Sequence, residues 1–163
     1  MYDYHLFIDA SAQPETKDGY GAALLVGPDN HSLPLEELSA QIQVFKFTDT
    51  SSTRVELETL LRALQDVPTT SRPLTVYTDS QNILSLLDRR SRLETQDFQS
   101  QKGKPLNNAA LYQSFFDALD RRGFTLVKVK GHKPTSQRDT IDQRFNLVDR
   151  AARKACRAGS IAV

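Results

Sequence analysis

The hydrophobic pattern of the chain changes its period near residue 53, and this change constrains the fold more than any other feature. Before it, three segments are rich in aromatic and branched residues or alternate polar with apolar side chains: residues 4–9, 21–26 and 41–47. Such segments are typical of strands. After it, leucines recur at helical spacing and predict a helix over residues 53–66.

Beyond that helix, strands and helices alternate. Residues 74–78 and 124–130 have strand patterns, whereas 82–87, 108–121 and the segment after residue 142 have helical ones. The polar segment 89–104 fits either a helical extension or an exposed loop. We therefore predict an α/β fold with a five-stranded mixed sheet, in which three antiparallel strands come first and parallel strands are added, with helices on both faces.

The length and composition restrict the class of protein. A chain of 163 residues suits a single domain over 1–163. The lone cysteine, Cys156, excludes an intramolecular disulfide framework and a zinc site built from several cysteines. No apolar run approaches the roughly 20 residues that span a bilayer, and the N-terminal residues do not resemble a signal peptide. We expect a cytoplasmic protein without a membrane partner, and a monomer as the simplest state.

Charge is distributed unevenly along the chain. Residues 1–80 contain 5 basic and 12 acidic side chains, and residues 81–163 contain 16 basic and 8 acidic ones. Residues 121–138 contain six basic side chains and no acidic one. This polarity is consistent with a cationic face for a polyanion and a separate carboxylate cluster, and also with a solvated surface of uneven charge.

Four acidic residues are candidates for chemistry. Asp9 and Asp79 stand at the predicted ends of two strands, where open α/β sheets place their ligand sites. Glu56 falls on the first turn of the predicted helix 53–66, and Asp149 falls on the last predicted helix.

Each of these residues also has a structural interpretation. Asp79 suits the N-cap of the following helix, and Glu56 lies three residues after Thr53, as in a capping box. Asp149 lies near arginines such as Arg153 and suits a surface ion pair.

Several motifs, taken together and in this order, resemble the type I ribonuclease H family, to which bacterial ribonuclease HI belongs. They are FIDAS, GYGAALLV, TRVELETLLRAL, YTDSQNI, ALYQSFFDAL, VKVKGH and VDRAARKA, and they extend from about residue 4 to residue 157. The order of elements predicted above matches the fold of that family, so the resemblance implies a ribonuclease H-like fold.

The resemblance implies a catalytic site of four carboxylates, Asp9, Glu56, Asp79 and Asp149, that bind metal. It also implies that His132, in the loop after the last strand, assists turnover, although alone it would be interpreted as an exposed loop residue. Carboxylate oxygens suit hard cations, so Mg²⁺ is the expected cofactor, with Mn²⁺ possible. Two such ions can bind the attacking water and the leaving oxygen of a phosphoryl displacement when substrate is present.

The substrate that the resemblance implies is the RNA strand of an RNA–DNA hybrid, cut internally to leave 3′-hydroxyl and 5′-phosphate ends. Recognition of such a duplex depends on backbone shape and 2′-hydroxyls. The candidate substrate-binding residues are Ser11, Ser52, Thr53 and Gln81 near the carboxylates, and Lys102 and Lys104 in the segment where bacterial members carry a basic protrusion.

The chain departs from the family at several of these positions. Ala10 stands where the family usually has glycine, and Ser52 and Thr53 replace a pair of asparagines. The segment 89–104 lacks the tryptophans of the family, since the chain contains none. These changes affect expected substrate contacts and leave all four acidic positions in place.

Other functions remain to be distinguished. A related 3′–5′ exonuclease of the DEDD type would carry Asp-x-Glu on its first strand, and Ser11 stands in place of that glutamate. A transposase or integrase core shares the sheet, but the chain is too short for the usual accessory domains. A catalytically silent nucleic-acid-binding module would gain nothing from four carboxylates placed beside phosphates.

Overall fold

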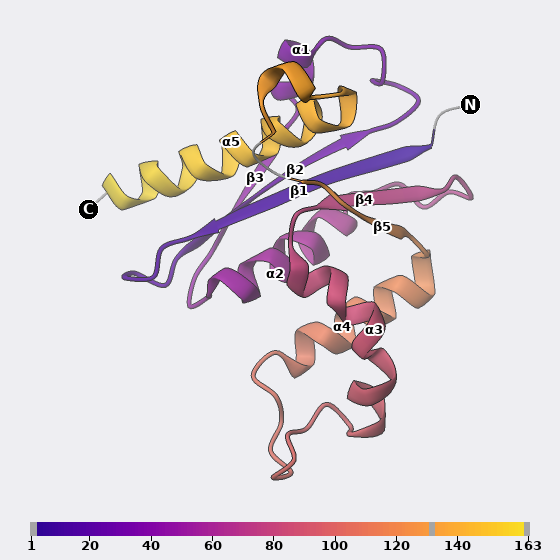
Figure 1. Cartoon of the computed structure of the whole chain (residues 1–163), viewed down its shortest axis with the longest axis vertical. Coiled ribbons are helices and arrows are strands. Elements are labelled where there is room, and N and C mark those ends of the chain that lie inside the picture. Colours follow the sequence, from indigo (N-terminus) through magenta and orange to yellow (C-terminus); the bar gives the residue numbers. More distant parts are fainter. Residues whose placement is uncertain (1–2, 131–132, 162–163) are drawn as a thin grey trace.

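Residues 3–130 and 133–161 are described by the computed structural model, and their strands form one mixed sheet (Figure 1). The strands are β1 (Tyr4–Ala12), β2 (Gly19–Val26), β3 (Gln43–Phe47), β4 (Leu74–Thr78) and β5 (Thr125–Lys128). Their order is β3-β2-β1-β4-β5. The first three pair antiparallel, whereas β4 pairs parallel with β1 and β5 parallel with β4. The predicted mixed sheet is therefore confirmed.

Helices cover both faces of this sheet (Figure 1). Those of the described residues are α1 (Leu35–Ser39), α2 (Ser52–Leu64), α3 (Gln81–Thr95), α4 (Ala109–Arg122) and α5 (Thr140–Ile161), and a 3₁₀ turn, η1 (Thr135–Gln137), precedes α5. One face carries α2, α3 and α4, and the other carries α1 and α5. None of the described helices is both long enough and apolar enough to cross a membrane.

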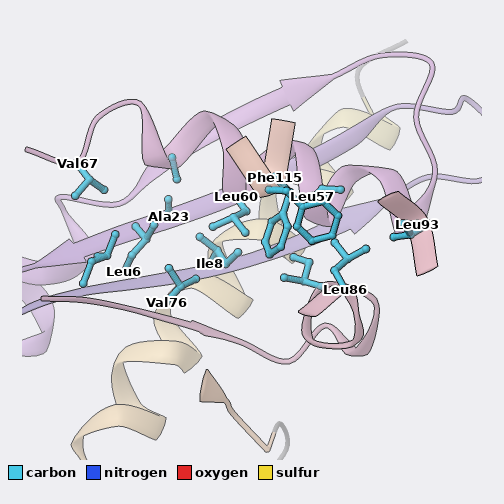
Figure 2. Close-up of a cluster of buried hydrophobic side chains, with 14 residues drawn as sticks. Leu6, Ile8, Ala23, Leu57, Leu60, Val67, Val76, Leu86, Leu93 and Phe115 are labelled. Atoms are coloured by element: carbon cyan, nitrogen blue, oxygen red, sulfur yellow. The ribbon is translucent and has the colours of Figure 1, made fainter. Parts of the chain in front are cut away.

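Side chains that alternate along β1 contribute to a separate core on each face. Leu6 and Ile8 are buried beneath α2, α3 and α4, and Figure 2 shows Ile8 beside Leu60 and Phe115. Phe7 points to the opposite face and is buried beneath α5. Full burial of one such side chain is worth roughly 1.5–3 kcal/mol, so both helical layers are held against the central strand.

Some predicted boundaries are wrong. The strand predicted over 4–9 continues to Ala12, so Asp9 lies inside β1 rather than at its end. The connection from β2 to β3 contains the unpredicted helix α1, in which only Leu38 is buried. In the segment 89–104, α3 continues to Thr95 and an exposed loop follows.

A glycine allows α2 to lie close to the sheet. A Cβ atom at Gly21 of β2 would stand 2.0 Å from Oγ1 of Thr59, a buried residue of α2. The Thr59 hydroxyl donates a hydrogen bond of 2.7 Å to the carbonyl of Val55, which holds its side chain in that place. Because Gly21 pairs with Ala10, this contact fixes α2 beside the segment of β1 that carries Asp9.

We expect Gly21→Ala to destabilise the protein by about 1–3 kcal/mol, because the added methyl group overpacks the contact between β2 and α2. Urea unfolding of Gly21→Ala, Thr59→Ala and the double variant measures the coupling between the two positions. The expected result is a smaller cost of Gly21→Ala when Thr59 is alanine. An equal cost in both backgrounds would show that this contact does not limit the packing.

Candidate active site

The register between β1 and β4 brings two acidic residues to the same edge of the sheet. The last residues paired in parallel are Phe7 and Tyr77. Two residues further along each strand stand Asp9 and Asp79, so the register continues to place them opposite one another. Asp9 is half-buried, whereas Asp79 is exposed to solvent.

Asp149 reaches the same place from α5. Its carboxyl group and that of Asp9 form a hydrogen bond. Burial, the charge of Asp79 and this bond together raise the pKa of Asp9 from 3.8 to about 9. Two carboxyl groups share a hydrogen bond only when one of them carries a proton, so the raised pKa favours a proton held between Asp9 and Asp149. Asp149 is held from its other side by Arg153, with 3.0 Å between Oδ1 and Nε.

Glu56 approaches from the first turns of α2. Its half-buried carboxylate accepts a hydrogen bond from the hydroxyl of Ser80 at the start of α3. Burial raises the pKa of Glu56 above its ordinary value; the Ser80 bond opposes the rise and the charge of Asp79 adds to it. Glu56 therefore interacts electrostatically with Asp79, which in turn interacts with Asp9.

Serines, and not these acidic residues, cap the two nearby helices. Ser51 caps α2 by accepting a hydrogen bond of 3.1 Å from the backbone N–H of Arg54. Ser80 caps α3 and accepts one of 3.2 Å from the N–H of Ile83. The structural interpretations of Asp79 as an N-cap and of Glu56 as part of a capping box with Thr53 are therefore wrong. That of Asp149 as a partner of Arg153 is correct, but it does not account for the bond to Asp9.

The candidate substrate residues expected near the carboxylates lie on β1, α2 and α3. Ser11 lies two residues after Asp9 and therefore on the same face of β1. Ser52 and Thr53 begin α2, and the Thr53 hydroxyl accepts a hydrogen bond of 3.4 Å from the amide of Asn82. Gln81 begins α3 and accepts a hydrogen bond of 3.3 Å from Lys128.

The remaining candidate residues are Lys102, Lys104 and His132. Lys102 and Lys104 are exposed in the loop between α3 and α4, which extends away from the sheet (Figure 1). They therefore do not join the carboxylates. His132 lies outside the described residues.

Sequence reasoning missed several neighbours of the carboxylates. Asp79 and Asp149 line a small pocket together with Lys130, Lys133 and Arg138, which come from the segment between β5 and α5. The absence of acidic residues from 121–138 was the signal that could have identified these cations. Ser80 and Asn82, which hydrogen-bond to Glu56, gave no such signal.

The donor set fits a hard cation. All four candidate side chains offer carboxylate oxygens, the ligands that Mg²⁺ and Mn²⁺ prefer. Burial is the main cause of the raised pKa of Asp9, and the charges of Asp79 and Asp149 add to it; a divalent cation would neutralise those charges. In the part of the chain that the structure describes, no group of three or more acidic, histidine or cysteine side chains already has the spacing of a metal site.

Comparison with known proteins gives consistent results. The model of the family described as RNase H matches residues 2–157. A curated protein, ribonuclease H of Hydrogenovibrio crunogenus, is 26% identical over 150 residues, which make up 90% of this chain and 94% of that protein.

Three solved structures share the fold. The solution structure of the PFV RNase H domain has a TM-score of 0.68 at 20% identity and covers 97% of this chain and 96% of that one. A foamy viral protease-reverse transcriptase in complex with dsDNA gives 0.60 at 14% identity, with 94% of each chain covered. The native protease-reverse transcriptase of prototype foamy virus gives 0.70 at 19% identity, covering 96% of this chain and 21% of that one.

We expect the metal-free protein to lose stability as the pH rises from about 4 to about 9. The pKa of Asp9 is about 9 in the folded state and 3.8 without its surroundings. Between these values only the folded state holds the proton, so raising the pH favours unfolding. Asp9→Asn should flatten this part of the dependence and stabilise the protein at alkaline pH.

Urea unfolding in a chelator, repeated across this pH range, measures the effect. Asp66→Asn makes the same chemical change at an exposed residue beyond the end of α2 and should retain the wild-type dependence. If Asp9→Asn also retained it, Asp9 would not be the buried acid that binds the proton.

Proposed function

Since the chain belongs to the RNase H family, a family of nucleases, we propose that it is an endonuclease that hydrolyses the RNA strand of RNA–DNA hybrids. One observation carries this proposal: Asp9, Asp79 and Asp149 interact electrostatically at one edge of the sheet, and Glu56 interacts with Asp79. Nothing in the hydrophobic cores requires carboxylates there, and their mutual repulsion costs folding free energy. The cluster therefore fits a role in binding cations and phosphates.

Asp9, Glu56, Asp79 and Asp149 would hold two Mg²⁺ ions, or Mn²⁺, when substrate is bound. The ions would supply an activated water and stabilise charge on the leaving oxygen, giving 3′-hydroxyl and 5′-phosphate products. Arg153 and Ser80 would orient Asp149 and Glu56, because each holds one oxygen of the carboxyl group that it contacts. Asp9 must release its proton before its carboxylate is available as a ligand.

Polar groups around the carboxylates would select the substrate. Ser11, Ser52, Thr53 and Gln81 present hydroxyl and amide groups suited to sugar 2′-hydroxyls, which distinguish RNA from DNA. Lys102 and Lys104, on the loop between α3 and α4, would contact phosphates further along the duplex. His132 would assist turnover.

Cleavage of an end-labelled RNA–DNA hybrid in Mg²⁺ tests the proposal. Internal cuts in the RNA strand are expected. Stepwise loss from one end would indicate an exonuclease, and binding without cleavage would indicate a silent module.

We expect Asp79→Asn to abolish this cleavage and to leave the metal-free protein equally or more stable. Two carboxylates about 4 Å apart repel by about 4 kcal/mol at an effective dielectric constant of 20, and the substitution removes one of those charges. Hybrid cleavage and thermal melting in a chelator measure the two effects. Asp66→Asn, whose side chain pairs with Arg62 on α2, is the matched control and should cleave as the wild type does. A clear loss of metal-free stability in Asp79→Asn would contradict a clustered site.

We expect His132→Ala to slow turnover while sparing hybrid binding. A neutral imidazole can transfer a proton or aid product release near neutral pH without holding the substrate. Steady-state kinetics should show a lower kcat with little change in KM. An unchanged kcat would remove His132 from the mechanism.

A further inference from the structure

A second set of charged residues lies beside the carboxylates, on the segment that joins β5 to α5. Lys133 and Arg138 line the same pocket as Asp79 and Asp149. The pocket thus has an acidic side and a basic side. A cation-binding role accounts for the acidic residues and leaves the basic ones, Lys130, Lys133 and Arg138, unexplained.

Lys133 is held in this pocket by an acidic residue outside the cluster. Its Nζ atom lies 3.1 Å from Oδ2 of Asp142, in the first turn of α5. The Asp142 side chain is only 10% exposed, whereas that of Lys133 is 34% exposed. The carboxylate is therefore mostly enclosed, while the ammonium group still reaches solvent at the pocket.

Asp142 is itself fixed at the start of α5. Its backbone N–H donates a hydrogen bond of 2.8 Å to Oδ1 of Asp139, and the N–H of Asp139 donates one of 3.2 Å to Oδ2 of Asp142. This reciprocal pair anchors the carboxylate to the helix that also carries Asp149. A rigid element therefore sets the position of Lys133 relative to Asp149.

Arg138 completes the arrangement. Its Nε atom donates a hydrogen bond of 3.0 Å to the carbonyl oxygen of Lys133, and this bond links the two residues directly. This bond uses one of the five N–H donors of the guanidinium group, and the bond to Asp142 uses one of the three of Lys133. Both cations therefore keep donors for a ligand.

The chemistry that matches these donors is a phosphate group. We propose that Lys133 and Arg138 bind a backbone phosphate of the nucleic acid next to the carboxylates, and that Asp142 is a positioning residue for Lys133. The proposal rests on the proposed function, because it assigns part of the same site to the same substrate. Asp142 lines the same pocket but is not one of the four candidate metal ligands, and its bond to Lys133 serves to place that cation.

The test measures the binding of an RNA–DNA hybrid by fluorescence anisotropy in a chelator, over a range of salt concentrations. Each phosphate contact contributes about 0.9 to the log–log slope of affinity against salt for duplex DNA. Lys133→Ala should reduce the slope by about that amount and weaken binding roughly tenfold at low salt. Lys133→Arg keeps the charge and should retain most of both. Arg62→Ala removes one positive charge far from the pocket and should leave the slope unchanged.

Asp142→Asn separates positioning from simple electrostatics. Removal of a negative charge beside phosphates should, by charge alone, tighten binding. If Asp142 positions Lys133, the substitution should weaken binding and raise KM more than it lowers kcat, while the asparagine can still accept the bond from the Asp139 N–H. Asp66→Asn is the control with the same change of charge, and should leave binding and KM unchanged. Tighter or unchanged binding by Asp142→Asn would overturn the positioning role.

The outcomes separate this proposal from the proposed function. Because binding is measured without cleavage, a reduced slope for Lys133→Ala would support the phosphate site even if the wild type did not cut the hybrid. Cleavage by the wild type, with equal slopes for Lys133→Ala and Arg62→Ala, would overturn the phosphate site and leave the proposed function intact. Absence of hybrid binding by the wild type would overturn both.

Discussion

Repulsion between carboxylates is the constraint that the rest of the structure must overcome. The raised pKa of Asp9 favours a proton shared between Asp9 and Asp149, which would partly relieve the repulsion in the absence of a cation. The burial of apolar side chains offsets the remaining electrostatic repulsion. Side chains of β1 contribute to hydrophobic cores on both faces of the sheet, so α2 and α5 are each held against this strand. The two helices bring Glu56 and Asp149 to a strand that already carries Asp9. The register with β4 adds Asp79.

Most of the fold could be predicted because it depends on repeating patterns. The period of two along residues 74–78 and the helical spacing of leucines near Leu60 follow directly from which side chains are buried. By contrast, α1 spans five residues with Leu38 as its buried residue, so it has no period to detect. The extension of β1 beyond Asp9 depends on pairing with β2, which is a contact between distant parts of the sequence.

The acidic residues of the candidate site could be predicted from the sequence, whereas the residues that contact them could not. Family motifs identified the positions of the four carboxylates, but Asp79 and Ser80 are both good helix caps, and only the backbone geometry shows that Ser80 is the cap. The contact of Lys133 with Asp142 spans nine residues and depends on η1 and the start of α5. The basic character of residues 121–138 indicated that cations gather somewhere, without showing that they line the carboxylate pocket.

The hydroxyl of Ser80 has two functions, because it accepts a hydrogen bond from the Ile83 N–H in the first turn of α3 and donates one to Glu56. Aspartate and asparagine are interchangeable with serine at most helix starts. At position 80, aspartate would bring a fifth anion to the cluster, and it has no proton to donate to Glu56. Serine therefore cannot be exchanged for aspartate here as it can at most helix starts. The stability of the α3 N-terminus and the orientation of Glu56 thus depend on the same oxygen atom. A substitution of Ser80 that changes one of them also changes the other.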